Sequence, residues 1–139
     1  MTMPKIVIPD DYPPVLAPSQ AYRGLIAKTA VDYHDSVPGS EERLIERIRD
    51  AEVVINIRSS SKFTEKVFAG APRLRLLSIW GTGTDNVDLA AAVRHGVTVT
   101  NTPGVSAVSM AEHTLALMLA VARQIPRIDA ETRQGRWPR

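Results

Sequence analysis

Five short apolar runs, each separated from the next by a segment long enough for a helix, constrain the fold of this chain more than any other feature. The runs cover residues 5–9, 30–34, 53–57, 74–80 and 97–100. No two-residue hairpin signal joins any two of them. Strands joined by helical crossovers run parallel, and helices then cover both faces of their sheet. The sequence therefore predicts an α/β fold with a flavodoxin-like, doubly wound, five-stranded parallel sheet.

Helices are expected between these strands over residues 19–28, 40–50, 64–69 and 85–95. Ser40 is expected to be the N-cap of the helix over 40–50, because serine is favoured at that position. Glu41 and Glu42 follow it in the first turn, where the helix dipole favours acidic residues. Leu44 and Ile48 mark the buried face of that helix.

A long apolar helix is expected over residues 109–125. Ser109 and Glu112 have the spacing of a capping box, and Pro126 is expected to end the helix. From Leu115 to Ala122 the helix is apolar around most of its circumference, so one sheet face cannot cover it. The apolar run is well short of the ~20 residues that a membrane span needs. We expect another domain or another chain on its second face; the alternative is an ordinary core helix whose alanines face water.

Composition excludes several classes of function. The chain has 139 residues, no cysteine, three separated histidines and a formal net charge of +2. Disulfides and thiolate nucleophiles are therefore absent, and the histidines lack metal-ligand spacing, so no metal site is expected. Charges of both signs are interspersed except at the C-terminus, where arginines cluster at 127, 133, 136 and 139. Without a basic stripe or interleaved aromatic residues, no nucleic-acid partner is expected. No signal pattern begins the chain, so a cytoplasmic location is the default expectation.

Three loops at the carboxyl ends of the predicted strands carry the chemistry. They are residues 58–61, 81–85 and 101–106, and open parallel sheets bind ligands at this edge. Arg58 has the fork of donors that binds a carboxylate or phosphate, although a surface ion pair explains it equally well from the pattern alone.

Gly81-Thr-Gly resembles the start of a dinucleotide-binding loop, but the third glycine of that motif would fall at Asn86. Asn101 stands where an acidic residue would be needed. What remains is a tight turn whose backbone amides either bind an anion at a helix start or form only a turn.

Two other functions are tested and rejected. A receiver-type phosphorylation module would use Asp10 and Asp11 as its acidic pair, but Arg58 and Pro103 stand near the positions of its acceptor Asp and its Lys. A nucleophilic hydrolase would need Gly-x-Ser-x-Gly, which is absent. His113 is expected to be a buried, hydrogen-bonded residue rather than a catalytic one.

Four segments together resemble the D-isomer-specific 2-hydroxyacid dehydrogenases, especially their D-3-phosphoglycerate dehydrogenase branch. The resemblance rests on the motifs Gly-Thr-Gly-Thr-Asp-Asn-Val-Asp-Leu at 81–89, Gly-Val-Thr-Val-Thr-Asn-Thr-Pro-Gly at 96–104, the segment 110–126 and Gly-Arg-Trp at 135–137. It implies a flavodoxin-like substrate domain over residues 1–108, with an inter-domain connector helix and tail over residues 109–139. The family's Rossmann domain, with its glycine motif and its catalytic Arg, Glu and His, would lie beyond Arg139, so no catalytic residue is assigned here.

The resemblance also implies roles for individual residues. Arg58 and Ser59 match the family's Arg-Ser that meets the charged end of the substrate. Thr82 and Gly83 match the loop whose amides hold the substrate carboxylate, and Thr82, Ser106 and Met110 match positions on the nicotinamide side. His113 matches a position that is not the catalytic acid.

The expected function is the substrate-binding part of an NAD- or NADP-dependent oxidoreductase that acts on the CH–OH group of a D-2-hydroxy acid. As a truncated or excised chain it is expected to be inactive alone and to bind no cofactor tightly. A homodimer through the 109–125 helix is expected. The alternative is a stand-alone small-anion-binding or self-associating module without catalysis, so whether this chain alone is an enzyme stays open.

Overall fold

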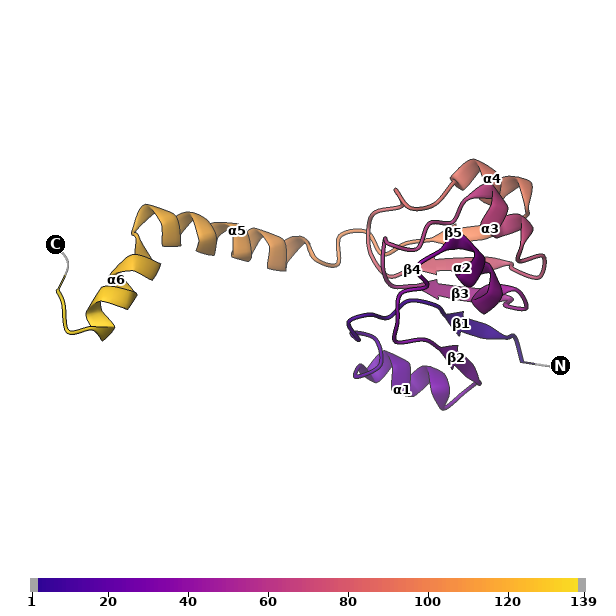
Figure 1. Cartoon of the computed structure of the whole chain (residues 1–139), viewed down its shortest axis with the longest axis horizontal. Coiled ribbons are helices and arrows are strands. Elements are labelled where there is room, and N and C mark those ends of the chain that lie inside the picture. Colours follow the sequence, from indigo (N-terminus) through magenta and orange to yellow (C-terminus); the bar gives the residue numbers. More distant parts are fainter. Residues whose placement is uncertain (1–2, 138–139) are drawn as a thin grey trace. The chain divides into compact units, whose positions relative to one another are not determined.

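A computed structural model describes residues 3–137, and the chain divides into two compact units, Met1–Pro103 and Gly104–Arg139 (Figure 1). The first unit contains, in chain order, β1 (Ile6–Ile8), α1 (Gln20–Ile26), β2 (Val31–Tyr33), α2 (Glu41–Ile48), β3 (Val53–Asn56), α3 (Glu65–Ala69), β4 (Leu76–Ile79), α4 (Leu89–Arg94) and β5 (Thr98–Thr100). The second unit contains α5 (Ala107–Ala122) and α6 (Ile125–Arg133).

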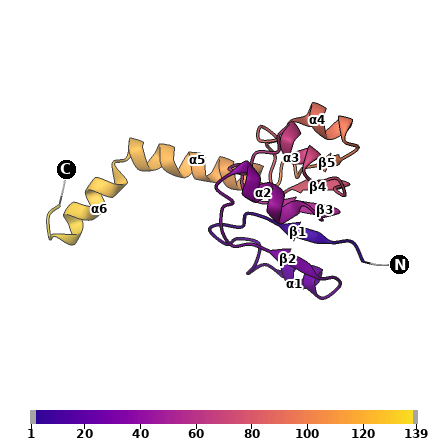
Figure 2. The same ribbon diagram turned by 45° about the vertical axis from the view of Figure 1, so that its right-hand side comes forward.

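The five strands form one sheet in the order β2-β1-β3-β4-β5, and every neighbouring pair is parallel. Figure 2 shows β5, β4, β3, β1 and β2 from top to bottom. This is the flavodoxin-like strand order, in which the chain reverses direction across the sheet between β1 and β3. The predicted fold class is confirmed.

Helices cover the two faces of the sheet because successive strand residues point to opposite sides. Val7 and Val54 lie in a core that α2, α3 and α4 complete, whereas Ile8 packs in a second cluster with Leu16 and with Tyr22 of α1. The larger core also contains Leu44 and Ile48 of α2, Val67 and Phe68 of α3, Leu77 of β4, and Ala91 and Ala92 of α4. The sheet is therefore doubly wound, as predicted.

The start of α2 matches its prediction, but the start of α4 does not. The Ser40 hydroxyl accepts a hydrogen bond from the Arg43 amide at 3.3 Å. The helix expected from Asp85 begins instead at Leu89, because Val87 first forms a bridge with Phe63. Asp88 is the N-cap of α4, and its carboxylate accepts from the Ala91 amide at 2.8 Å.

The helix predicted over 109–125 has different bounds in the second unit. Ser106 is the N-cap of α5, so Ser109 lies inside the helix, where its helical backbone prevents the predicted capping box. Gln124 has a left-handed φ of 51°, which separates α5 from α6. Pro126 therefore lies in the first turn of α6, where its missing N–H removes no helical hydrogen bond. It does not end α5.

Apart from Ala120, every residue of α5 is exposed. His113 is therefore exposed as well, and the expectation of a buried histidine is wrong. Among the helices in residues 3–137, none has the length and apolar character that crossing a lipid bilayer requires.

Candidate functional site

The carboxyl ends of β1, β3, β4 and β5 carry the polar loops of the first unit. Because all strands are parallel, these ends share one edge of the sheet. Asp10 and Asp11 follow β1, residues 58–61 follow β3, residues 81–85 follow β4, and Asn101 and Thr102 follow β5. The edge also contains the reversal point between β1 and β3, where open α/β sheets bind ligands.

Gly81 forms a turn that is fastened to the loop after β5. Its φ of 155° suits glycine. The Gly81 amide donates to the Thr102 hydroxyl at 3.0 Å, and the Thr102 amide donates back to the Gly81 carbonyl at 2.9 Å. The Asn101 side chain donates to the Thr82 carbonyl at 2.8 Å. These bonds hold the turn at a fixed place on the edge.

The backbone amides of Thr82 and Gly83 are available to a ligand. Both residues are exposed, and within residues 3–137 neither amide donates a hydrogen bond. A β-carbon on Gly83 would lie 3.3 Å from Asp85 Oδ2, so a side chain here would crowd that carboxylate. Two adjacent free amides suit a carboxylate oxygen, although the negative charge of Asp85 nearby weakens their attraction for an anion.

Arg58, at the start of the loop that follows β3, is the positively charged residue of the candidate site. Its guanidinium donates to the Pro13 carbonyl, and its Nε is buried without a hydrogen-bond partner in the described part of the chain. None of the salt bridges within residues 3–137 involves Arg58. The alternative that Arg58 forms a surface ion pair is therefore not supported within residues 3–137. Ser59, the neighbouring predicted residue, is exposed.

Asp10 lies beneath Arg58 and is 0% exposed. Its carboxylate accepts from Asn56 Nδ2 at 2.7 Å, from the Ile57 amide at 3.0 Å and from the Arg58 amide at 3.3 Å. Burial raises the pKa of Asp10 above its usual range, and this effect outweighs the side chain of Ser61, the Ile57 and Arg58 amides and the charge of Arg58, which all act in the opposite direction. Asp10 thus holds the start of the Arg58 loop from inside the protein.

The buried hydrogen-bond chain continues from Asn56 to Asn86. Asn86 Nδ2 donates to Asn56 Oδ1 at 2.9 Å and to the Ser61 carbonyl at 2.8 Å. In the sequence, Asp10 resembles only an acid of a phosphorylation module, Asn86 stands only where a glycine would be needed, and Asn56 is not predicted as a site residue. The available signal was one polar residue, Asn56, inside the apolar run of β3.

The Asp10→Asn variant is expected to remove a pH dependence of stability. Because folding raises the pKa of Asp10 above its ordinary value of 3.8, the folded chain binds this proton more tightly than the unfolded chain. Its contribution to the free energy of unfolding is then largest below that ordinary pKa and falls as pH rises through the folded pKa. Urea unfolding between about pH 4 and pH 7 measures this dependence. The free energy of unfolding of the natural chain should fall relative to that of the variant, by about 1.4 kcal/mol for a folded pKa that is higher by one. A difference between the two chains that is constant with pH, or that favours the natural chain as pH rises, would contradict this expectation.

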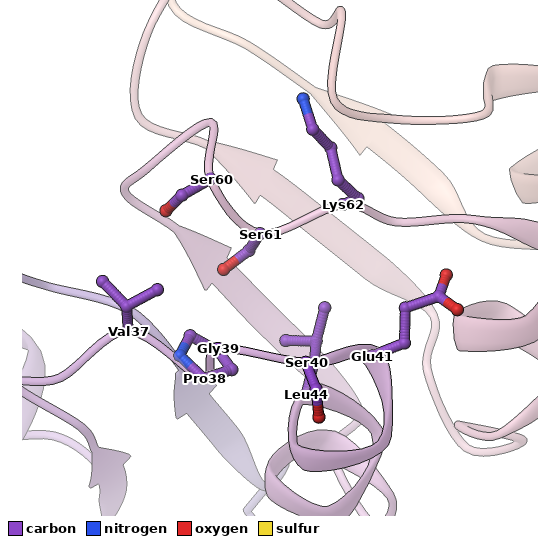
Figure 3. A pocket seen from close by; sticks show the side chains of 9 residues that line it. All are labelled: Val37, Pro38, Gly39, Ser40, Glu41, Leu44, Ser60, Ser61 and Lys62. Carbon is purple, nitrogen blue, oxygen red and sulfur yellow. The ribbon is translucent and has the colours of Figure 1, made fainter.

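A pocket of about 340 Å³ lies beside the Arg58 loop (Figure 3). Ser60 and Ser61 lie on one side of it, and Val37 and Pro38 lie opposite them. Gly39, Ser40, Glu41, Leu44 and Lys62 complete its lining. The loop predicted to bind substrate thus contributes Ser60 and Ser61 to this pocket, but not Arg58 or Ser59.

The described residues do not fit a dinucleotide phosphate site. The Gly81 turn leads into the bridge at Val87, not into a helix, and the Asp88 carboxylate already occupies the start of α4. The predicted anion site therefore lies at the turn itself and not at a helix start. Ser106 and Met110, predicted on the nicotinamide side, belong to the second unit, where Met110 is 60% exposed. Residues 3–137 contain no cluster of three His, Cys, Asp or Glu side chains able to hold a metal.

Comparison with known proteins assigns the chain to a family. Residues 13–136 match the family described as D-isomer specific 2-hydroxyacid dehydrogenase, catalytic domain. The chain belongs to the D-isomer specific 2-hydroxyacid dehydrogenase family. The resemblance inferred from the four sequence segments is confirmed, and Arg58, Ser59, Thr82, Gly83, Ser106 and Met110 all lie within the matched range.

Individual 2-hydroxyacid dehydrogenase relatives agree with this assignment. D-3-phosphoglycerate dehydrogenase of Methanocaldococcus jannaschii is 42% identical over 100 residues, which are 72% of this chain and 19% of that protein. The crystal structure of a phosphoglycerate oxidoreductase from Vibrio cholerae matches with a TM-score of 0.73 and 32% identity over 99% of this chain and 43% of that one.

An acyclic imino acid reductase in complex with NADPH and D-Arg is also similar in structure. It matches with a TM-score of 0.81 and 27% identity, over 95% of this chain and 41% of that one. In each case the chain spans less than half the length of the relative that it matches.

Proposed function

We propose that this chain is the substrate-binding part of an NAD- or NADP-dependent oxidoreductase that acts on the CH–OH group of a D-2-hydroxy acid. The substrates would be acids of the phosphoglycerate, glyoxylate or hydroxypyruvate type. Family membership supports the reaction class, and the names of the relatives support phosphoglycerate as the first substrate to test.

The observation that carries the proposal is the pair of free amides at Thr82 and Gly83. An acid carboxylate on these amides would be held by a turn that Thr102 and Asn101 already fix, so little ordering is needed on binding. Arg58 and Ser59 would meet the other charged end of the substrate. Arg58 is suited to a phosphate because its fork of donors matches the phosphate oxygens.

Oxidation at C2 of such an acid removes a hydride from carbon and the proton from its hydroxyl, leaving a 2-keto acid. The residues described here bind and orient the acid, but the turn at Gly81 does not fit a dinucleotide phosphate. We therefore propose that the hydride acceptor and the proton-transferring group belong to a part of the enzyme outside residues 3–137. Thr82, Ser106 and Met110 would border the nicotinamide side of the substrate.

We also propose that the chain forms a homodimer through the segment 109–125. Leu115, Met118 and Val121 of α5 are exposed, together with Leu117, Leu119 and Ile125. Large apolar side chains that are exposed along one segment in this number are typical of a protein interface. The domain division proposed from the sequence, 1–108 for substrate binding and 109–139 as connector, would then give the connector a second role.

The purified chain alone is expected to show no dehydrogenase turnover. The assay follows absorbance of the reduced nicotinamide with NAD or NADP and 3-phosphoglycerate, and with the reduced cofactors and glyoxylate or hydroxypyruvate. The physical reason is that, within residues 3–137, the turn at Gly81 does not fit a dinucleotide phosphate, so the nicotinamide is not held beside C2 of the acid. Turnover that increases in proportion to the concentration of chain would overturn the assignment as a substrate-binding part only.

A further inference from the structure

Three buried side chains hold the loop that carries Arg58. The Asp10 carboxylate accepts from the Arg58 amide at 3.3 Å, and Asn56 Nδ2 donates to the Arg58 carbonyl at 2.9 Å. At the other end of the loop, Asn86 Nδ2 donates to the Ser61 carbonyl at 2.8 Å. Residues 58–61 are therefore fixed at both ends by side chains beneath them.

Asn86 also belongs to the second loop of the candidate site. It follows Asp85 directly at the end of the Gly81 turn, and its carbonyl accepts from the Phe63 amide at 2.8 Å. Its side-chain amide donates both to Asn56 and to the Ser61 carbonyl, and the residue is only 5% exposed. One residue thus joins the loop of the Thr82 and Gly83 amides to the loop of Arg58.

We propose that Asn86 is a positioning residue that sets the separation between Arg58 and the amides of Thr82 and Gly83, and so selects acids with an anionic group at each end. This inference rests on the proposed function, because it assumes that the two loops bind one substrate. An acid with a single carboxylate needs only the amides of the turn. An acid with a carboxylate and a phosphate needs both loops at a fixed distance.

The test compares two acids and two chains. Calorimetric titration with 3-phosphoglycerate and with glyoxylate is carried out on the natural chain and on Asn86→Ala, which removes both donors to Asn56 and Ser61. Affinity for 3-phosphoglycerate is expected to fall about tenfold or more, because the charge-assisted contact with Arg58 is displaced. Affinity for glyoxylate is expected to stay within about twofold, because Gly81 remains fastened to Thr102.

A control variant separates positioning from stability. Val97→Ala removes buried apolar volume before β5, at the opposite end of the sheet from the loops, and should leave the ratio of the two affinities unchanged. Thermal unfolding checks that each variant is folded. Should Asn86→Ala fail to fold, Asn86→Ser, which keeps one donor, is expected to show a smaller loss of affinity for 3-phosphoglycerate, again without a loss for glyoxylate.

The outcomes are distinct. A parallel loss of affinity for both acids, no change in affinity for either acid, or the same selective loss of affinity in Val97→Ala would overturn the positioning role. If the natural chain bound neither acid, the proposed function itself would fail, and this inference with it. Selective loss of 3-phosphoglycerate affinity in the Asn86 variants alone is the supporting result.

Discussion

Replacing Phe63 with alanine is expected to lower the free energy of unfolding of the first unit by about 3–5 kcal/mol. Phe63 is 0% exposed, and its ring lies 6.3 Å from that of Phe68 between the ring centroids. Its backbone also joins the two loops of the site, since its amide donates to Asn86 and its carbonyl accepts from Asp88 at 2.9 Å. The variant would therefore open a cavity in the larger core of the first unit.

Urea unfolding followed by the fluorescence of Trp80 measures this loss, with Trp137→Phe introduced into every chain so that only the first unit is observed. Val93→Ala is the control, because Val93 lies on α4 but is 78% exposed; its substitution should change the free energy of unfolding by no more than about 0.5 kcal/mol. A loss below about 1 kcal/mol in Phe63→Ala would contradict the full burial of this side chain in the core.

The fold was predictable from the sequence because its signals are local. The five apolar runs, the lack of hairpin turns and the cap at Ser40 each depend on residues close together in the chain. They were enough to predict a parallel doubly wound sheet, and the structure confirms it. Helix boundaries were less predictable where contacts from distant residues intervene. α4 starts at Leu89 and not at Asp85, because Val87 pairs with Phe63, and no local sequence pattern indicates that pairing.

The candidate site was predictable only in part. Arg58, Thr82 and Gly83 were predicted from their residue types, from their places after strands and from the family resemblance. The side chains that hold their loops were missed, because Asp10 and Asn56 meet across 46 positions of sequence, and Asn56 and Asn86 across 30. Such a buried network exists only once the sheet has formed. The break at Gln124 was also missed, since nothing in its residue type requires a left-handed backbone.

Replacing Arg58 with methionine is expected to weaken binding of 3-phosphoglycerate about 10–100-fold. Hydrogen bonds to a charged group contribute about 1.5–3 kcal/mol, and each 1.4 kcal/mol corresponds to about tenfold in affinity. Methionine keeps much of the length of the side chain while removing the charge and every donor. Arg73→Met is the matched control. Arg73 forms a salt bridge with Glu52 at 3.3 Å, and both side chains are partly exposed. The two residues precede β4 and β3, at the opposite end of the strands from the site.

The natural chain, Arg58→Met and Arg73→Met should each be titrated with 3-phosphoglycerate while the backbone amide resonances are recorded. We expect saturable shifts centred on Thr82 and Gly83 in the natural chain and in Arg73→Met, and an affinity reduced about 10–100-fold in Arg58→Met. Shifts centred instead on the pocket between Val37 and Ser60, or equal affinity in all three chains, would contradict this expectation.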